Sequence, residues 1–176
     1  VVSLSLHDTE GEPAESGGWS SVVFSRDDSG RRVDRTFRDK SGNPSRGLSY
    51  TTLRVSFDQF GIETSRSHLN SEGEPVTVNG YAAAVHDHSE EGSLLETVYI
   101  SPDSSLVMNP ELGFARLYCD YYGDGIPLSR EWYDHRGRPA YPGNRGYAAI
   151  SYVHNSLGSR VESRFLDSSG SLICPD

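Results

Sequence analysis

The chain repeats one pattern of residues about every 31 to 33 positions. A segment that begins GYAAAV at Gly80 is matched by a segment that begins GYAAIS at Gly146. An aromatic residue opens each copy, and a glycine follows it eleven positions later. The aromatic positions are Trp19, Tyr50, Tyr81, Phe114 and Tyr147, and the glycines are Gly30, Gly61, Gly92, Gly125 and Gly158. A period of this length is typical of a tandem array of small supersecondary units, so we expect a repeat protein.

A second group of residues recurs later in each copy. Eighteen positions after the opening aromatic stands a ring, at Phe37, His68, Tyr99, Trp132 and Phe165, with Leu6 in the upstream copy. A polar residue follows two positions later, usually with glycine three positions after it and proline two further on, as in Asp39, Gly42 and Pro44. Aspartate and asparagine bond back to the backbone, glycine adopts positive φ, and proline donates nothing to a ladder. Each copy is therefore expected to contain two turns.

Between the turns, apolar residues alternate with polar ones. Val22 and Phe24 alternate before the first turn, and Val33 and Phe37 after it, while Asp34 falls on the other face. Period-two alternation predicts strands with one buried face, and no window shows helical spacing. We therefore expect an all-β tandem array of antiparallel hairpins, a meander of about eleven strands. So many twisted strands tend to curl, which favours a barrel-like, solenoid or spiral wall.

The repeat suggests one β-repeat domain over residues 1–176. Its approximate units are a partial unit at 1–17 and full units at 18–48, 49–79, 80–112, 113–145 and 146–176. The chain opens on a strand pattern and closes within a turn pattern, which favours a segment of a longer array.

The composition limits the kinds of partner. Only 35% of the residues are hydrophobic and the formal net charge is −9, so we expect a thin core and no binding to nucleic acid. No run approaches the roughly 18 apolar residues of a membrane helix, so membrane insertion is not expected. Cys119 and Cys174 lack the spacing of a metal site or a disulfide framework, and we expect a buried thiol and a terminal thiol.

Two stretches carry a resemblance to a known family. RDDSGRRVDRTFRDKSGNP and WYDHRGRPA resemble the YD-type, or RHS-like, tandem repeats of bacterial proteins, in which an aromatic-x-D-x-x-G turn recurs between short antiparallel strands. The resemblance covers nearly the whole chain. It implies a stack of hairpins, within a larger bacterial protein, that encloses, displays or binds something without catalysis. Glucan-binding and choline-binding cell-wall repeats use similar aromatic-Asp-Gly hairpins.

The candidate binding residues are rings. Aromatic residues at strand spacing are more often core than ligand platforms, but Trp132 and Tyr133 are adjacent and must point to opposite faces, so one should be exposed. The candidate binding residues are Trp132, Tyr133, Tyr99 and Trp19.

A metal site is the least favoured hypothesis. His86 and His88 lie two positions apart, where a strand sends both imidazoles to one face. The position of His86 is Phe24, Val55, Cys119 or Tyr152 in the other copies, which favours a packed imidazole pair.

The sequence therefore predicts a non-catalytic binding or scaffolding module with no cofactor. A protein partner is the first choice, because acidic and aromatic residues interleave along the strands. A carbohydrate of the cell envelope is the alternative, bound through exposed rings. No Ser-His-Asp order, Cys-His pair or phosphate loop indicates an enzyme. A secreted or cell-envelope location is favoured.

Overall fold

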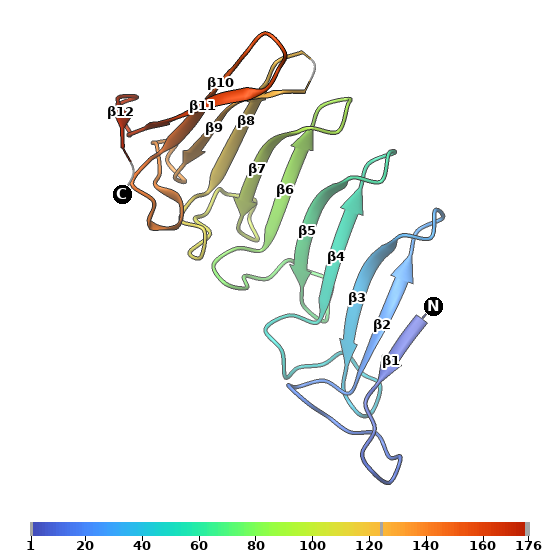
Figure 1. The fold of residues 1–176 in the computed structure, drawn as a ribbon. Coiled ribbons are helices and arrows are strands. Elements are labelled where there is room, and N and C mark those ends of the chain that lie inside the picture. Colours follow the sequence, from blue (N-terminus) through green and yellow to red (C-terminus); the bar gives the residue numbers. More distant parts are fainter. Residues whose placement is uncertain (1, 124, 175–176) are drawn as a thin grey trace. The chain divides into compact units, whose positions relative to one another are not determined.

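The computed structural model describes residues 2–123 and 125–174, and they form antiparallel strands in chain order (Figure 1). The strands are β1 (Val2–Ser5), β2 (Ser21–Arg26), β3 (Arg32–Arg38), β4 (Thr52–Phe57), β5 (Glu63–Leu69), β6 (Ala83–His88), β7 (Leu94–Ile100), β8 (Arg116–Tyr121), β9 (Pro127–Tyr133), β10 (Ala149–His154), β11 (Arg160–Leu166) and β12 (Leu172–Ile173). A three-residue 3-10 turn, η1 (Pro142–Asn144), lies between β9 and β10. The predicted all-β hairpin array is confirmed.

The strand order follows the chain from β1 to β12. Twelve strands form where about eleven were expected, because the chain after the last turn stays paired over two residues, with Leu172 opposite Leu166 and Ile173 opposite Phe165. At the corresponding place in earlier copies the pairing is a single bridge, as between Arg38 and Pro44. The order does not close on itself in the described residues, so the barrel-like form is wrong.

The described chain contains two compact parts. The N-terminal part comprises Val1–Val78, Ala82–Ala84 and Ser101–Asp103, and the C-terminal part comprises Asn79–Tyr81, Val85–Ile100 and Ser104–Asp176. Within each part, a short turn closes one end of a hairpin, and a long connection leaves from the other end toward the next hairpin (Figure 1).

Most of the described turns share one hydrogen-bond pattern, which explains the recurrent D-x-x-G. In the turn between β2 and β3, Asp27 Oδ1 accepts the backbone N–H groups of Ser29 and Arg31 at 3.0 and 2.9 Å. The N–H of Gly30, at φ +80°, bonds the Asp27 carbonyl at 2.9 Å. The same side-chain pattern recurs at Asp8, Asp39, Asp58, Asn70, Ser89, Asp134, Asn155 and Asp167.

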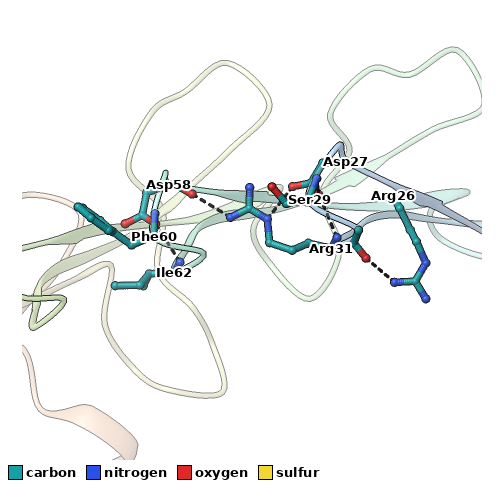
Figure 2. A network of polar contacts seen from close by, with 8 residues as sticks. Arg26, Asp27, Ser29, Arg31, Asp58, Phe60 and Ile62 are labelled. Atoms are coloured by element: carbon teal, nitrogen blue, oxygen red, sulfur yellow. Dashed lines mark hydrogen bonds and ion pairs between the residues drawn. The ribbon is translucent and has the colours of Figure 1, made fainter.

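Consecutive short turns contact one another. Figure 2 shows Arg31, whose Nε bonds its own turn at Asp27 Oδ2 (2.6 Å) and whose Nη1 donates to the carbonyl of Asp58 in the next turn (2.9 Å). In the C-terminal part, Ile126 takes the equivalent position, and a Cβ atom added to Gly158 would lie 2.7 Å from its Cδ1. The regular spacing of the turn glycines along the chain therefore serves both turn geometry and stacking between neighbouring hairpins.

One face of the sheet carries the core. The register places Val22 opposite Phe37, Leu53 opposite His68, Leu117 opposite Trp132 and Ile150 opposite Phe165. We call this the ring-bearing face. Its rings pack edge-on or tilted, with centroids 4.9 to 5.9 Å apart, in the pairs Trp19–Phe37, Phe37–Tyr50, Tyr50–His68, Tyr81–Tyr99, Tyr99–Phe114, Trp132–Tyr147 and Tyr147–Phe165. Such pairs contribute about 0.5–1.5 kcal/mol each beyond the area they bury.

A small buried residue follows each opening aromatic and joins neighbouring hairpins. Ala148 donates its N–H to the carbonyl of Leu166 (2.8 Å) and accepts the N–H of Trp132 (3.1 Å). The same position holds Ser20, Thr51, Ala82, Ala115 and Ala148, all of them buried. A larger side chain would push the backbones of adjacent hairpins apart.

The opposite face, which we call the polar face, carries cross-strand ion pairs. Asp34 on β3 pairs with Arg54 on β4 at 2.9 Å, and Glu96 on β7 pairs with Arg116 on β8 at 3.0 Å. The acidic residues predicted for this face therefore have arginine partners. Both cysteines are free, Cys119 buried and Cys174 exposed, as expected.

No helix in the described ranges is long and apolar enough to cross a membrane.

The stacked turns predict unequal costs for two glycine substitutions. Gly158 and Gly137 both have φ +75°, but a Cβ would meet Ile126 at the first and nothing within 4 Å at the second. We expect Gly137→Ala to lower the free energy of unfolding by about 1–2 kcal/mol, from the left-handed backbone alone, and Gly158→Ala to lower it further. Urea unfolding followed by circular dichroism measures both. Adding Ile126→Ala to Gly158→Ala should remove the excess; equal effects of the two glycine variants would contradict the stacking.

The turn at Asp134 predicts an acid-dependent loss of stability. The backbone N–H of Arg138, the Arg138 side chain and the N–H of Arg136 lower the pKa of Asp134 from 3.8 to about 2. A carboxyl with a depressed pKa in the folded state stabilises the fold above about pH 4 and loses that contribution as the pH falls toward 2. We expect an NMR titration midpoint near 2, and a smaller loss of stability between pH 4 and 2 in Asp134→Asn. Asn70 and Asn155 already accept the same backbone bonds in their turns, so this variant should fold.

Candidate functional site

The ring-bearing face is covered only at the end where the long connections leave. There Phe37 and Trp132 are 9% and 6% exposed. In the C-terminal part the connection contributes Asn109, which is buried and whose side chain bonds the Tyr99 hydroxyl. Toward the short turns, Phe24 and Tyr152 on the same face are half-buried, and Val161 is 62% exposed. Part of an apolar sheet face is therefore open to solvent.

Arginines lie over rings of this face, in its open part and at its covered end. The guanidinium of Arg32 lies 4.8 Å from the ring centroid of Phe24, and that of Arg160 lies 5.4 Å from the centroid of Tyr152. Arg35 lies 5.2 Å from the centroid of Phe37. None of the three pairs with a carboxylate in the described residues. Cation–π contact can hold a guanidinium against an aromatic face while its N–H donors remain available for other partners.

A β-bulge turns two of these arginines toward the rings. In the hairpin of β10 and β11 the register shifts between Val153 and His154, so that His154 pairs with Arg160. In the hairpin of β2 and β3 it shifts between Ser25 and Arg26, so that Arg26 pairs with Arg32. Bulges re-aim side chains, and here strict alternation would have sent Arg160 and Arg32 to the polar face.

The C-terminal part contains an open groove of about 540 Å³ on this face. Its floor and walls come from β9, β10, β11 and the two turns beside them. The groove is lined by Gly125, Ile126, Pro127, Arg130, Tyr152, His154, Gly158 and Arg160. It combines two guanidinium groups and an imidazole with an aromatic ring and two aliphatic surfaces.

The N-terminal part contains a smaller groove of about 200 Å³. It is lined by Phe24, Arg32, Val33, Asp34, Arg35, Leu53, Val55 and Arg66. Arg66 is bound to Glu63 at 2.9 Å, so this groove is partly neutralised. The same two ingredients, arginine and exposed apolar surface, occur in both parts.

The structure separates the four candidate rings. Trp132 and Tyr99 are buried, at 6% and 8% exposure, so a ligand has little access to them. Trp19 is half-buried against Phe37. Tyr133 points to the opposite face from Trp132, as adjacent strand residues must, and is half-buried there.

Tyr133 belongs to a small cluster on the polar face. Its hydroxyl donates to Glu131, and this bond, with burial, raises the pKa of Tyr133 to about 12. Its ring meets Tyr118 edge-on at 5.8 Å, and Tyr118 is 43% exposed.

The two histidines lie together on β6, as predicted. The ring centroids of His86 and His88 are 6.4 Å apart, and His86 Nδ1 lies 3.0 Å from the hydroxyl of Thr97. Among the described residues, no group of three histidine, cysteine, aspartate or glutamate side chains is placed to hold a metal ion. The pair has no third ligand there.

Sequence reasoning missed the arginines of the ring-bearing face. Arg35, Arg66 and Arg130 stand sixteen positions after the opening aromatics and two before the ring position. That spacing was available in the sequence and could have been found. Arg32 and Arg160 could not, because the bulge decides the face to which they point.

No protein-family model and no curated protein sequence matches this chain.

Burial predicts that Trp132 is a core residue and Tyr133 is not. Trp132→Ala should lower the free energy of unfolding by about 3–5 kcal/mol, the usual cost of removing a buried large ring. Tyr133→Phe removes one hydrogen bond and should cost about 1 kcal/mol or less. Urea unfolding monitored by circular dichroism compares them, since Trp132→Ala changes the fluorescence probe. A mild effect of Trp132→Ala would return that ring to the set of ligand contacts.

Proposed function

We propose that this chain is a non-catalytic repeat module that binds another protein through the open part of its ring-bearing face. The observation that carries the proposal is that three features occur together on that face: half-buried rings, exposed aliphatic side chains, and arginines that form no ion pair with a carboxylate of the described residues. Arginine and aromatic residues are enriched at protein interfaces and dominate their binding energy. An uncovered apolar sheet face also favours burial by a partner.

The non-catalytic part of the proposal is supported by what the acidic side chains do. The recurrent acids Asp27, Asp58 and Asp134 accept backbone N–H groups within their turns. On the strands, Asp34 and Glu96 pair with arginines across the polar face. These carboxylates have structural partners and do not converge on one cleft, as an acid and base pair would need to do.

The likeness to YD-type, RHS-like bacterial repeats belongs to the same proposal. The turns closed by Asp39 and Asp134 are the aromatic-x-D-x-x-G elements on which the resemblance rests, and each follows a strand that is paired antiparallel with its neighbour. A segment of a larger bacterial protein that displays or holds a partner would use such an array.

A carbohydrate is the second candidate, and it would use the polar face. Tyr118 is exposed there, edge-on to Tyr133 and near the Glu131 carboxylate. An exposed ring beside a carboxylate can stack on a sugar and accept its hydroxyl protons. The two candidates therefore predict binding on opposite faces.

A peptide-display selection on the purified chain tests the protein-binding proposal. We expect enriched peptides whose binding falls by about tenfold or more in Arg32→Glu or Arg160→Glu, because each reversal places a carboxylate over an aromatic ring of the binding face. Arg164→Gln, on the polar face, is the matched control and should leave binding unchanged.

A glycan array with the same variants tests the alternative. Glycan binding that is lost in Tyr118→Ala and kept in the two arginine variants would replace the protein proposal. No enriched peptide, or peptides insensitive to both arginine variants, would remove it.

A further inference from the structure

The groove of the C-terminal part is basic although the chain is acidic. The formal net charge is −9, yet none of the described residues that line the groove carries a carboxylate. Its ionisable side chains are Arg130, Arg160 and His154, with the phenol of Tyr152. Random placement of 25 acidic and 16 basic residues would favour the opposite sign. Such local inversion of charge is a sign of recognition of an anionic group.

Arg130 is held at the base of the groove by its strand. It lies in β9, opposite Cys119 of β8 and Ile150 of β10, so its side chain points to the ring-bearing face. Its interaction with the Cys119 thiol is that of a strong donor with a weak acceptor. A guanidinium has five N–H donors, and Arg130 forms no ion pair within residues 2–123 and 125–174. Donors suited to a carboxylate therefore remain at this position.

Arg160 and His154 form the other side of the groove. The Arg160 guanidinium lies over the Tyr152 ring, and it too pairs with no carboxylate in the described part of the chain. His154 pairs with Arg160 across the bulge, and its Nδ1 is buried without a hydrogen-bond partner among the described residues. A buried polar atom without a partner is costly unless a ligand or water satisfies it.

The rest of the groove is apolar. Ile126 and Pro127 form one wall, and Ile126 is held in place against Gly158 of the next turn. A bare anion would leave these surfaces and the Tyr152 ring in contact with water. A carboxylate next to an apolar or aromatic side chain would satisfy the arginines and bury the walls together. Long polyanions such as nucleic acid fit less well, because the charge of the whole chain repels them.

We infer that this groove binds an acidic peptide segment of the partner protein, with a carboxylate between Arg130 and Arg160 and a neighbouring apolar side chain against Tyr152, Ile126 and Pro127. The inference rests on the proposed protein-binding function and names the chemistry of the partner. A simpler role for Arg160, without any ligand, would be to cover the Tyr152 ring. That role accounts for the cation–π contact. It does not account for the absence of carboxylates among the described lining residues or for the position of Arg130.

A sequence-bias measurement in the peptide-display selection tests this inference. Peptides selected on the wild-type chain should carry aspartate or glutamate well above the library frequency, next to aromatic or aliphatic residues. The acidic excess should disappear in selections on Arg130→Gln and Arg160→Gln, and persist on Arg164→Gln, which lies outside the groove and pairs with Glu162. Thermal unfolding of each variant checks the fold, and Arg130→Lys keeps the charge if Arg130→Gln is unstable.

Fluorescence anisotropy then compares the affinity of the most enriched peptide with that of a control peptide in which every acidic residue is replaced by its amide. We expect the acidic peptide to bind the wild type at least about tenfold more tightly, as one charge-assisted contact provides. Added salt should reduce this difference in affinity, because it screens the charges.

The outcomes separate the two proposals. Selected peptides without an acidic excess, or an excess that survives both groove variants, overturn the groove inference and leave the protein-binding function standing. A selection that enriches no peptide overturns both.

Discussion

Most hairpins of this protein are closed by a turn in which one side-chain oxygen accepts two backbone N–H groups. At Asp27 and Asp39 that oxygen closes the two ends of β3, and glycine at positive φ completes each turn. The turns set the length of the strands and the register in which they pair. Because side chains alternate along a strand, the register then decides which residues share a face. The ring-bearing face and the polar face both follow from these turns.

The strands form one layer with two faces, and in the described residues the long connections cover part of one of them. The long connections bury the end of the ring-bearing face that carries Phe37 and Trp132, and the other end remains open. The small residues after each opening aromatic, such as Ala148, are what allow adjacent hairpins to approach closely enough for the rings to pack. In each part the core is therefore a series of rings along one margin of its strands, and the remainder of that face is open to solvent.

Arginine side chains have two kinds of environment in this structure. Arg31 connects two consecutive turns and has a structural role that its bonds explain. Arg130 and Arg160 have no carboxylate partner in the described residues, and they lie where the apolar face is open. The polar face shows the contrasting case, because Arg54 and Arg116 are neutralised there by Asp34 and Glu96. Among the described residues, these two arginines without a carboxylate partner therefore lie on the part of the ring-bearing face that the long connections leave open.

The sequence by itself determined the repeat, the two turns of each copy and the residues of each strand that share a face, since turn chemistry and period-two alternation are local properties. Asp34 lies on the face opposite to that of Val33 and Phe37, as the pattern predicted. Tertiary structure alone decided which rings are covered: Phe24 and Phe37 share a face, but only Phe37 lies where the connection returns. It also decided the groove, because the bulge beside the short turn reverses the face of Arg160 and brings it over Tyr152 beside Arg130. Which rings are covered depends on contacts between segments distant in the chain, and alternation along one strand does not encode it. The bulge lies beside the short turn and interrupts the alternation from which the face of Arg160 is predicted.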